Sequence, residues 1–234
     1  MNALITGSNC DIGISLSKAL LDLGYNLYLG YNNNCDNIDK LMSKYNNITK
    51  IHLDVTNEKE IIEVTNKIDN IDLLINLSAI CIDNNYLDKT KEEFMKVLEV
   101  NLVGMFLVIK HLSKKVNNKG LIMNMSSTDG IDTYNELSID YSSSKAGIIN
   151  MSKSISLCTN NRVLCICPNW IDTSSTRDMD LEYLDSELKR IGQDRLINID
   201  EFIVGFDKII NSNFNSGDIF RIDIKGDKLW VEKM

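Results

Sequence analysis

Residues 2–24 read NALITGSNCDIGISLSKALLDLG, and three kinds of local structure can be recognised in them. Asn2 to Thr6 is an apolar segment of strand length. From Ile12 to Leu23 the apolar residues recur at intervals of three and four, which predicts a helix, and Gly24 supplies its C-terminal stop. A turn containing Gly7 and Gly13 joins the two. The chain therefore begins with a strand, a glycine-containing turn and a helix.

The same alternation of strand and helix continues to the end of the chain. Six further apolar segments have strand length: Asn26 to Tyr31, Ile48 to Leu53, Ile71 to Ile75, Leu121 to Met125, Arg162 to Cys167 and Asp218 to Ile224. Helix-start signals lie between them, at Thr56 or Asn57, at Thr90 with Glu93, and at Ser138 or Asp140. Continuously apolar strands are typical of a parallel sheet covered on both faces. We therefore predict one α/β domain over residues 1–234, a Rossmann-type doubly wound parallel sheet of about seven strands with helices on both faces.

Composition excludes several classes of protein. The formal net charge of −8 argues against a nucleic-acid partner or an anionic membrane, because such binding draws its affinity from clustered Lys and Arg. The six cysteines form no C-x-x-C pair and only two histidines accompany them, so we expect no metal site. No run approaches 18 apolar residues and no signal peptide precedes the first strand. We expect a cytoplasmic protein with reduced thiols.

The turn after the first strand has the context of a dinucleotide-binding turn. Its glycines let the backbone pass close to a pyrophosphate, and the following helix directs free N–H groups and a positive partial charge towards it. Asp11 stands where such turns usually have a glycine. We expect Asp11 to cap the helix and to place a carboxylate near the phosphates, which weakens cofactor binding unless the side chain turns away.

A second group of residues suits proton transfer. Tyr141 and Lys145 are four residues apart and share one helix face, and Ser127 follows the Leu121 to Met125 strand. Hydride transfer to a ketone leaves negative charge on the oxygen, so a positioned donor must supply a proton. A free tyrosine, with a pKa of about 10, releases its proton too reluctantly at neutral pH. We expect the Lys145 ammonium to stabilise the tyrosinate and so to lower the pKa of Tyr141.

In this order along the chain, the motifs resemble those of the short-chain dehydrogenase/reductase family from end to end. The matching elements are Thr6-Gly7-x-x-x-x-Ile12-Gly13, Asp54-Val55, Asn76-x-x-Ala79, Asn101, Ser127, Tyr141-x-x-x-Lys145 and Pro168-x-x-Ile171-x-Thr173. The resemblance implies an NAD(P)-dependent oxidoreductase with catalytic residues Asn101, Ser127, Tyr141 and Lys145. In it Tyr141 is the acid/base, Ser127 hydrogen-bonds the substrate oxygen, Lys145 also holds the nicotinamide ribose, and Asn101 supports a water leading to Lys145. The implied cofactor contacts are Gly7, Ser8, Asp11, Ile12, Gly13, Tyr31, Asp54, Val55, Asn76, Ala79, Tyr141, Lys145, Pro168, Ile171 and Thr173.

The end of the second strand bears on cofactor choice. Tyr31 stands where an Asp or Glu would bind a free ribose 2′-hydroxyl, which favours NADP(H) over NAD(H). Cys10, however, occupies a place where relatives often carry Arg, so a usual partner of the 2′-phosphate is absent.

The resemblance is greatest to bacterial 3-oxoacyl-(acyl-carrier-protein) reductases, which implies a small-molecule or carrier-bound carbonyl substrate. An acidic carrier needs a basic landing patch, which Lys110, Lys114, Lys115 and Lys119 could form, although a solvated helix end explains them equally well. The alternatives are a reductase of the 5-aminopentanone group on elongation factor P, a sugar, polyol or steroid dehydrogenase, and a non-catalytic dinucleotide-binding sensor.

Two further interpretations concern assembly and mobility. The resemblance implies a homotetramer or homodimer formed through the helices around Asn101 and Tyr141, to which Phe106, Ile109, Ile148, Met151 and Ile155 offer apolar surface, unless these side chains belong to the core. The polar segment from Thr173 to Gln193 predicts either a lid over a ligand or an ordinary surface helix and loop.

Overall fold

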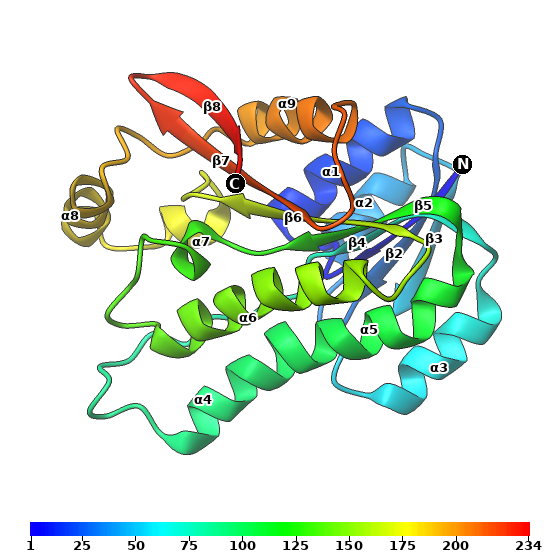
Figure 1. The fold of residues 1–234 in the computed structure, drawn as a ribbon, viewed down its shortest axis with the longest axis horizontal. Helices are drawn as coiled ribbons and strands as arrows, with labels where there is room; N and C mark the ends of the chain where they lie inside the picture. The colour runs from blue at the N-terminus through cyan, green and yellow to red at the C-terminus, as the bar shows by residue number, and fades with distance from the viewer.

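The computed structural model describes residues 1–234 and contains one eight-stranded sheet (Figure 1). The strands are β1 (Asn2–Thr6), β2 (Asn26–Tyr31), β3 (Ile48–His52), β4 (Ile71–Asn76), β5 (Val116–Met125), β6 (Arg162–Pro168), β7 (Asp218–Lys225) and β8 (Lys228–Lys233). They lie in the order β3-β2-β1-β4-β5-β6-β7-β8, and β1 to β7 pair in parallel. The α/β fold and all seven predicted strands are confirmed.

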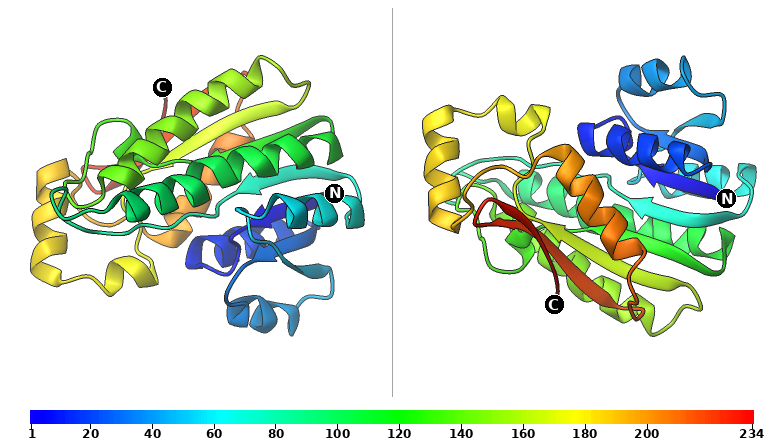
Figure 2. Two further views of the ribbon diagram at one scale, coloured as in Figure 1. Left: turned by 90° about the horizontal axis from the view of Figure 1, so that it is seen from below. Right: turned by 90° about the horizontal axis from the view of Figure 1, so that it is seen from above.

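Helices cover both faces of the sheet (Figure 2). They are α1 (Asp11–Asp22), α2 (Asp36–Met42), α3 (Glu58–Lys67), α4 (Lys91–Leu98), α5 (Met105–Leu112), α6 (Ile139–Ser156), α7 (Ser174–Arg177), α8 (Leu181–Ile191) and α9 (Ile199–Ile210). One core lies between the sheet and α1, α2 and α9, where Leu16, Ile38 and Phe202 are buried. The other lies under α3, α5 and α6, where Ile61, Val108 and Ile148 are buried. This double cover explains the continuously apolar strands.

The predicted start signals of α3 and α4 and the stop signal of α1 are confirmed, whereas Ser138 precedes α6 without a side-chain capping hydrogen bond. Asn57 caps α3, and Thr90 and Glu93 form a reciprocal capping box at the start of α4. Gly24 follows α1 with a φ of +83°, a left-handed conformation that a glycine adopts without strain. These signals depend on neighbouring residues only, which is why the sequence shows them.

The last strand was not predicted, and it runs antiparallel to β7. Gly226 and Asp227 join the two strands, with φ values of +54° and +61°. Such a pair of left-handed residues matches the twist of a two-residue hairpin. Besides the seven predicted strands, the sheet therefore has an eighth strand, which makes it mostly parallel.

The side chains that were predicted to offer apolar surface for assembly differ in their exposure. Ile109 and Ile148 are buried in the core beneath α5 and α6, so core packing accounts for them. Phe106 on α5 is 46% exposed, and Met151 and Ile155 are partly buried. No helix is both long enough and apolar enough to span a membrane.

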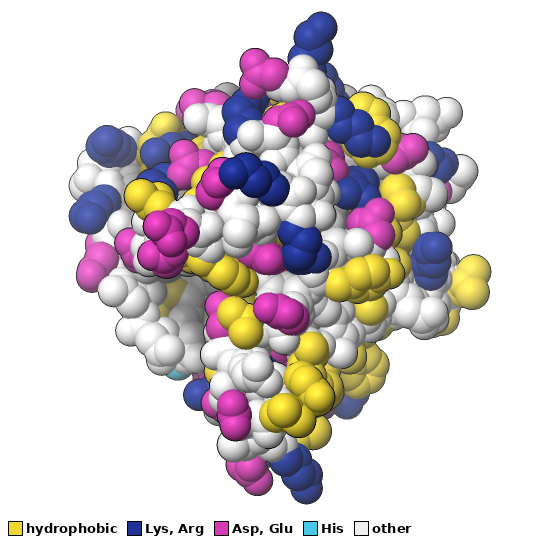
Figure 3. Space-filling model, turned by 90° about the vertical axis from the view of Figure 1, so that its left-hand side faces the viewer, with side chains coloured by type: hydrophobic (Ala, Val, Ile, Leu, Met, Phe, Trp, Pro, Cys, Tyr) yellow, Lys and Arg dark blue, Asp and Glu magenta, His cyan; other side chains and the backbone are white.

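The lysines near the start of β5 lie far from the edge of the sheet where the strands end. Lys114 and Lys115 precede β5, whereas Ser127 follows its carboxyl end. Lys110 pairs with Glu58 at 2.7 Å, and the Lys115 ammonium donates to the Ile68 carbonyl. These contacts favour a solvated helix end over a landing patch. Figure 3 faces the edge where the strands end and shows acidic and basic side chains mixed over it.

Candidate active site

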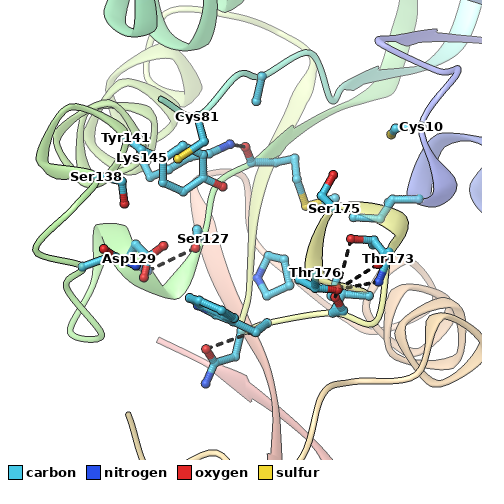
Figure 4. A pocket seen from close by; sticks show the side chains of 18 of the residues that line it. Cys10, Cys81, Ser127, Asp129, Ser138, Tyr141, Lys145, Thr173, Ser175 and Thr176 are labelled. Atoms are coloured by element: carbon cyan, nitrogen blue, oxygen red, sulfur yellow. Dashed lines mark hydrogen bonds between the residues drawn. The ribbon is translucent and has the colours of Figure 1, made fainter. Parts of the chain in front are cut away.

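A cavity of about 370 Å³ opens where β1, β4, β5 and β6 end (Figure 4). It is lined by the turn before α1, the segments after β4, β5 and β6, the start of α6, and α7 and α8. The carboxyl edge of an open α/β sheet is where ligands bind in such folds. Of the predicted site residues, those that line the cavity are Asp11, Ile12, Ala79, Ser127, Tyr141, Lys145, Pro168, Ile171 and Thr173.

The turn between β1 and α1 is held in one shape by close backbone packing. Gly7 has a φ of +61°, and a Cβ there would lie 2.8 Å from the Ser78 Cα. A Cβ on Gly13 would lie 2.5 Å from the Ser8 carbonyl oxygen. Ser8 is fully buried and donates both its N–H and its hydroxyl to the Gly30 carbonyl. These three residues therefore fix the shape of the turn without lining the cavity, whereas Asp11 and Ile12 line it.

Asp11 does not cap α1, which corrects the prediction. The N-cap is Cys10, whose thiol accepts from the Gly13 N–H at 3.4 Å. The Asp11 carboxylate turns instead to α7, where it accepts from the Ser174 N–H at 2.5 Å and lies 3.4 Å from the Arg177 guanidinium. Arg177 also pairs with Asp172, so it offsets the Asp11 charge only in part, but the Asp11 carboxylate is engaged at α7 rather than at the N-terminus of α1.

Tyr141 and Lys145 meet as their spacing on α6 predicts. The Lys145 Nζ lies 5.1 Å from the centroid of the Tyr141 ring and donates to the Met125 carbonyl at 3.0 Å. Ser127 is the last residue before a short 3-10 turn and lies beside the phenol (Figure 4). The three side chains come from two segments of the chain and converge on one wall of the cavity.

Burial dominates the titration of this pair. The pKa of Tyr141 is raised above its ordinary value, chiefly because burial disfavours the phenolate and also because the Asp129 carboxylate is near. The expectation that Lys145 lowers the pKa of Tyr141 is therefore corrected to a net rise of that pKa. Burial also lowers the pKa of Lys145 to about 8. At neutral pH the phenol is thus a proton donor and the lysine is largely charged.

Asn101 lies apart from the cavity, in a π-helical segment between α4 and α5 (Glu99–Gly104). Its amide is fully buried, accepts from the Ile80 N–H at 2.8 Å and donates to the Ile80 carbonyl at 2.9 Å. It also donates to the Ser144 hydroxyl at 3.1 Å. The side chain therefore joins the segment after β4 to α6, the helix that carries Tyr141 and Lys145.

The remaining predicted cofactor residues lie away from this cavity. Tyr31, at the end of β2, packs edge-on against His52 with ring centroids 5.5 Å apart. Asp54 accepts from both the N–H and the hydroxyl of Thr56, and Val55 packs against Gly104. Asn76 is buried and donates to Asn124, while its own Oδ1 has no partner. Tyr31, Asp54 and Val55 lie at or just after the ends of β2 and β3, whereas Asn76 ends β4 in the middle of the sheet.

Several cavity residues were missed by the sequence analysis. They are Cys81, Asp83, Asp129, Asn135, Trp170 and Tyr183. Asp129 had a usable signal, because it follows Ser127 by two residues at the end of a predicted strand. The others belong to loops and to α8, whose approach to the cavity depends on the whole fold.

The cavity and the turn fit a dinucleotide. The first N–H groups of α1 have no acceptor within the helix, and the cavity extends from Asp11 and Ile12 to Tyr141 and Lys145. Gly7 and Gly13 leave no room for a side chain, so the backbone alone forms the turn. A pyrophosphate at α1 and a nicotinamide near Lys145 is therefore the arrangement that these residues can accommodate.

Comparison with known proteins agrees with this geometry. A family model described as short chain dehydrogenase matches residues 1–183. The chain is 29% identical over 198 residues to the 3-oxoacyl-(acyl-carrier-protein) reductase of Rickettsia prowazekii, covering 81% of this chain and 80% of that protein. It is 30% identical over 189 residues to the reductase of the same description from Aquifex aeolicus, covering 74% and 75%.

Solved structures share the fold. A short-chain dehydrogenase/reductase from Serratia marcescens superposes with a TM-score of 0.86 at 19% identity, covering 97% of this chain and 98% of the other. A 3-oxoacyl-(acyl carrier protein) reductase from Brucella melitensis gives 0.83 at 22% identity, covering 94% and 88%.

Proposed function

Because the chain belongs to the short-chain dehydrogenase/reductase family of enzymes, we propose that it reduces a carbonyl to an alcohol with NAD(P)H, with Tyr141 as the acid/base. The observation that carries this proposal is the convergence of Ser127, Tyr141 and Lys145 on one wall of the cavity that begins at the N-terminus of α1.

Each side chain has a chemical part in this reaction. The bound nicotinamide supplies the hydride. Ser127 donates a hydrogen bond to the substrate oxygen, and the Tyr141 phenol donates its proton as negative charge develops there. The Lys145 ammonium then stabilises the tyrosinate left behind, since opposite charges within a few Å favour the ionised form. Asn101 holds the Ile80 backbone and α6 in register and so acts as a positioning residue.

For the cofactor, NADP(H) is favoured over NAD(H). Tyr31 offers no carboxylate to bind a free 2′-hydroxyl or to repel a 2′-phosphate. The Lys50 ammonium lies 5.8 Å from the centroid of the Tyr31 ring, so a cation stands beside this end of β2. That cation is also paired with Asp39, which limits its share in phosphate binding.

For the substrate, a 3-oxoacyl thioester is the first candidate, because the relatives with that activity cover four-fifths of the chain. The 5-aminopentanone group of elongation factor P and sugar, polyol or steroid carbonyls remain alternatives. The lysines before β5 give no support to carrier docking, since they lie at the opposite edge of the sheet.

A homotetramer or homodimer formed through α5 and α6, with Phe106 in the contact, is part of the same proposal. Light scattering measures the assembly directly.

The test is oxidation of NADPH and NADH, followed at 340 nm, with a panel of carbonyl compounds that includes acetoacetyl-CoA. We expect turnover with at least one ketone and a lower KM for NADPH than for NADH. A protein that binds either dinucleotide tightly but oxidises neither with any carbonyl would instead be a dinucleotide-binding sensor.

A further inference from the structure

Asp129 is a buried acid that the proposed reaction does not use. It lies in the short turn after Ser127, is 7% exposed and lines the cavity beside Tyr141 (Figure 4). Its N–H donates to the Ser127 hydroxyl at 3.2 Å, and its Oδ1 accepts from the Thr133 hydroxyl at 2.6 Å. Asp129 therefore lines the same cavity as Ser127 and Tyr141, between which a substrate carbonyl would lie.

No cation of the chain forms an ion pair with Asp129. The nearest candidates are engaged elsewhere: Arg190 donates to the carbonyls of Thr133 and Tyr134 and to Glu187, and Lys145 donates to the Met125 carbonyl. Burial raises the pKa of the Asp129 carboxyl, and the hydrogen bonds to it and the charges of Arg190 and Lys145 offset this rise only in part. A buried, unpaired acid lowers the stability of a fold, so its presence in a substrate cavity points to a ligand that pairs with it.

The other groups on this side of the cavity suit a cation as well. Asp83 adds a second carboxylate at the rim, and Trp170 and Tyr183 add aromatic rings, whose faces attract cations. Lys145 is the only basic residue lining the cavity, and it lies on the wall beneath Tyr141. An anionic substrate would therefore meet two carboxylates on this side of the cavity, where no basic side chain lies.

We propose that Asp129 is a specificity-determining residue that pairs with an ammonium group on the substrate, so that the enzyme prefers amino ketones to neutral or carboxylate-bearing ketones. This inference rests on the proposed carbonyl reduction, and within it favours a ketone that carries an ammonium group over the 3-oxoacyl thioesters suggested by the relatives. A carboxylate next to the hydroxyl that orients the carbonyl fixes the ammonium at a short spacing from the reacting carbon.

The experiment compares three methyl ketones of equal chain length that end in an ammonium, a methyl or a carboxylate group. We expect kcat/KM for the ammonium ketone to exceed that for the methyl-ended ketone by about ten- to a hundredfold, as for a hydrogen bond to a charged group. The Asp129→Asn variant should lose most of this ratio, and Asp129→Glu should retain part of it. Asp132→Asn is the matched control, because it removes an acid three residues away that pairs with Arg221 outside the cavity.

Equal kcat/KM values for the ammonium and methyl ketones in the wild type would overturn the inference. An unchanged ratio in Asp129→Asn would do so too, and would leave the carboxylate only its bond to Thr133. In both cases reduction of the methyl ketone or of acetoacetyl-CoA would keep the proposed function intact. Failure to reduce any of these compounds would count against the proposed function itself.

Discussion

The Tyr141 phenol and the Lys145 ammonium show what a sequence can and cannot predict about single side chains. Their spacing on α6 predicts that they share a face, and the structure places them 5.1 Å apart, from Nζ to ring centroid. The predicted direction of the Tyr141 pKa shift was wrong, because burial and the nearby Asp129 carboxylate raise this pKa. The degree of burial is set by loops and helices distant in sequence, so spacing alone does not show it.

The lowered pKa of Lys145 makes a prediction about stability. Between pH 8 and about 10.5 the unfolded chain holds a proton on this lysine that the folded protein has released, so stability rises with pH over this window. A shift of this size corresponds to about 3 kcal/mol. Urea unfolding at pH 7, 8, 9 and 10 should therefore show the wild type gaining up to about 3 kcal/mol relative to Lys145→Met.

The exposed Lys153 on the same helix provides the control, since Lys153→Met should give a curve parallel to that of the wild type. Parallel curves for Lys145→Met and the wild type would show that the buried ammonium carries no such energetic cost.

Helices and strands with local signals were predicted well, and those that depend on distant partners were not. The seven parallel strands and the caps of α3 and α4 follow from apolar patterns and capping residues. The cap of α1 was misassigned to Asp11, because that side chain is drawn away by Ser174 and Arg177, more than 160 residues later. β8 was missed because its residues alternate in polarity only weakly and its pairing depends on the hairpin at Gly226.

The loop between β4 and α4 is tied to α6 by a buried ion pair. Lys89 and Asp140 are 2.8 Å apart and almost wholly inaccessible, at 1% and 0% exposure. Asp140 also accepts from the N–H of Tyr141, and Lys89 donates to the Ile82 carbonyl. Lys89→Met leaves an uncompensated buried carboxylate and should lower the free energy of unfolding by about 3–5 kcal/mol.

Chemical denaturation of matched variants checks this prediction. Lys110→Met breaks an ion pair whose partners are 49% and 43% exposed, and it should cost no more than about 1 kcal/mol. Similar losses in the two variants would mean that the Lys89 pair does not hold the loop to α6.

At the scale of the whole molecule, the lining of the cavity was the feature that the sequence predicted least well. Its walls come from the ends of four strands and from α6, α7 and α8, so residues such as Trp170 and Tyr183 acquire a place in it only through the complete fold. The ordered motifs were enough to predict the fold and to predict that Ser127, Tyr141 and Lys145 lie close together. They gave no sign that Asp129 would be left unpaired, because its potential partners are occupied by carbonyls and by Glu187.

The most direct measurement is the rate of NADPH oxidation by Tyr141→Phe with the best ketone of the panel. The variant keeps the ring and removes the donor, so we predict a fall in kcat of about 10²- to 10⁴-fold, the share usual for positioned acid–base catalysis. Tyr183→Phe is the matched control, because it removes a phenol oxygen from the same cavity, and NADPH fluorescence verifies cofactor binding in both. Turnover by Tyr141→Phe within a few-fold of the wild type, with cofactor binding retained, would contradict the account.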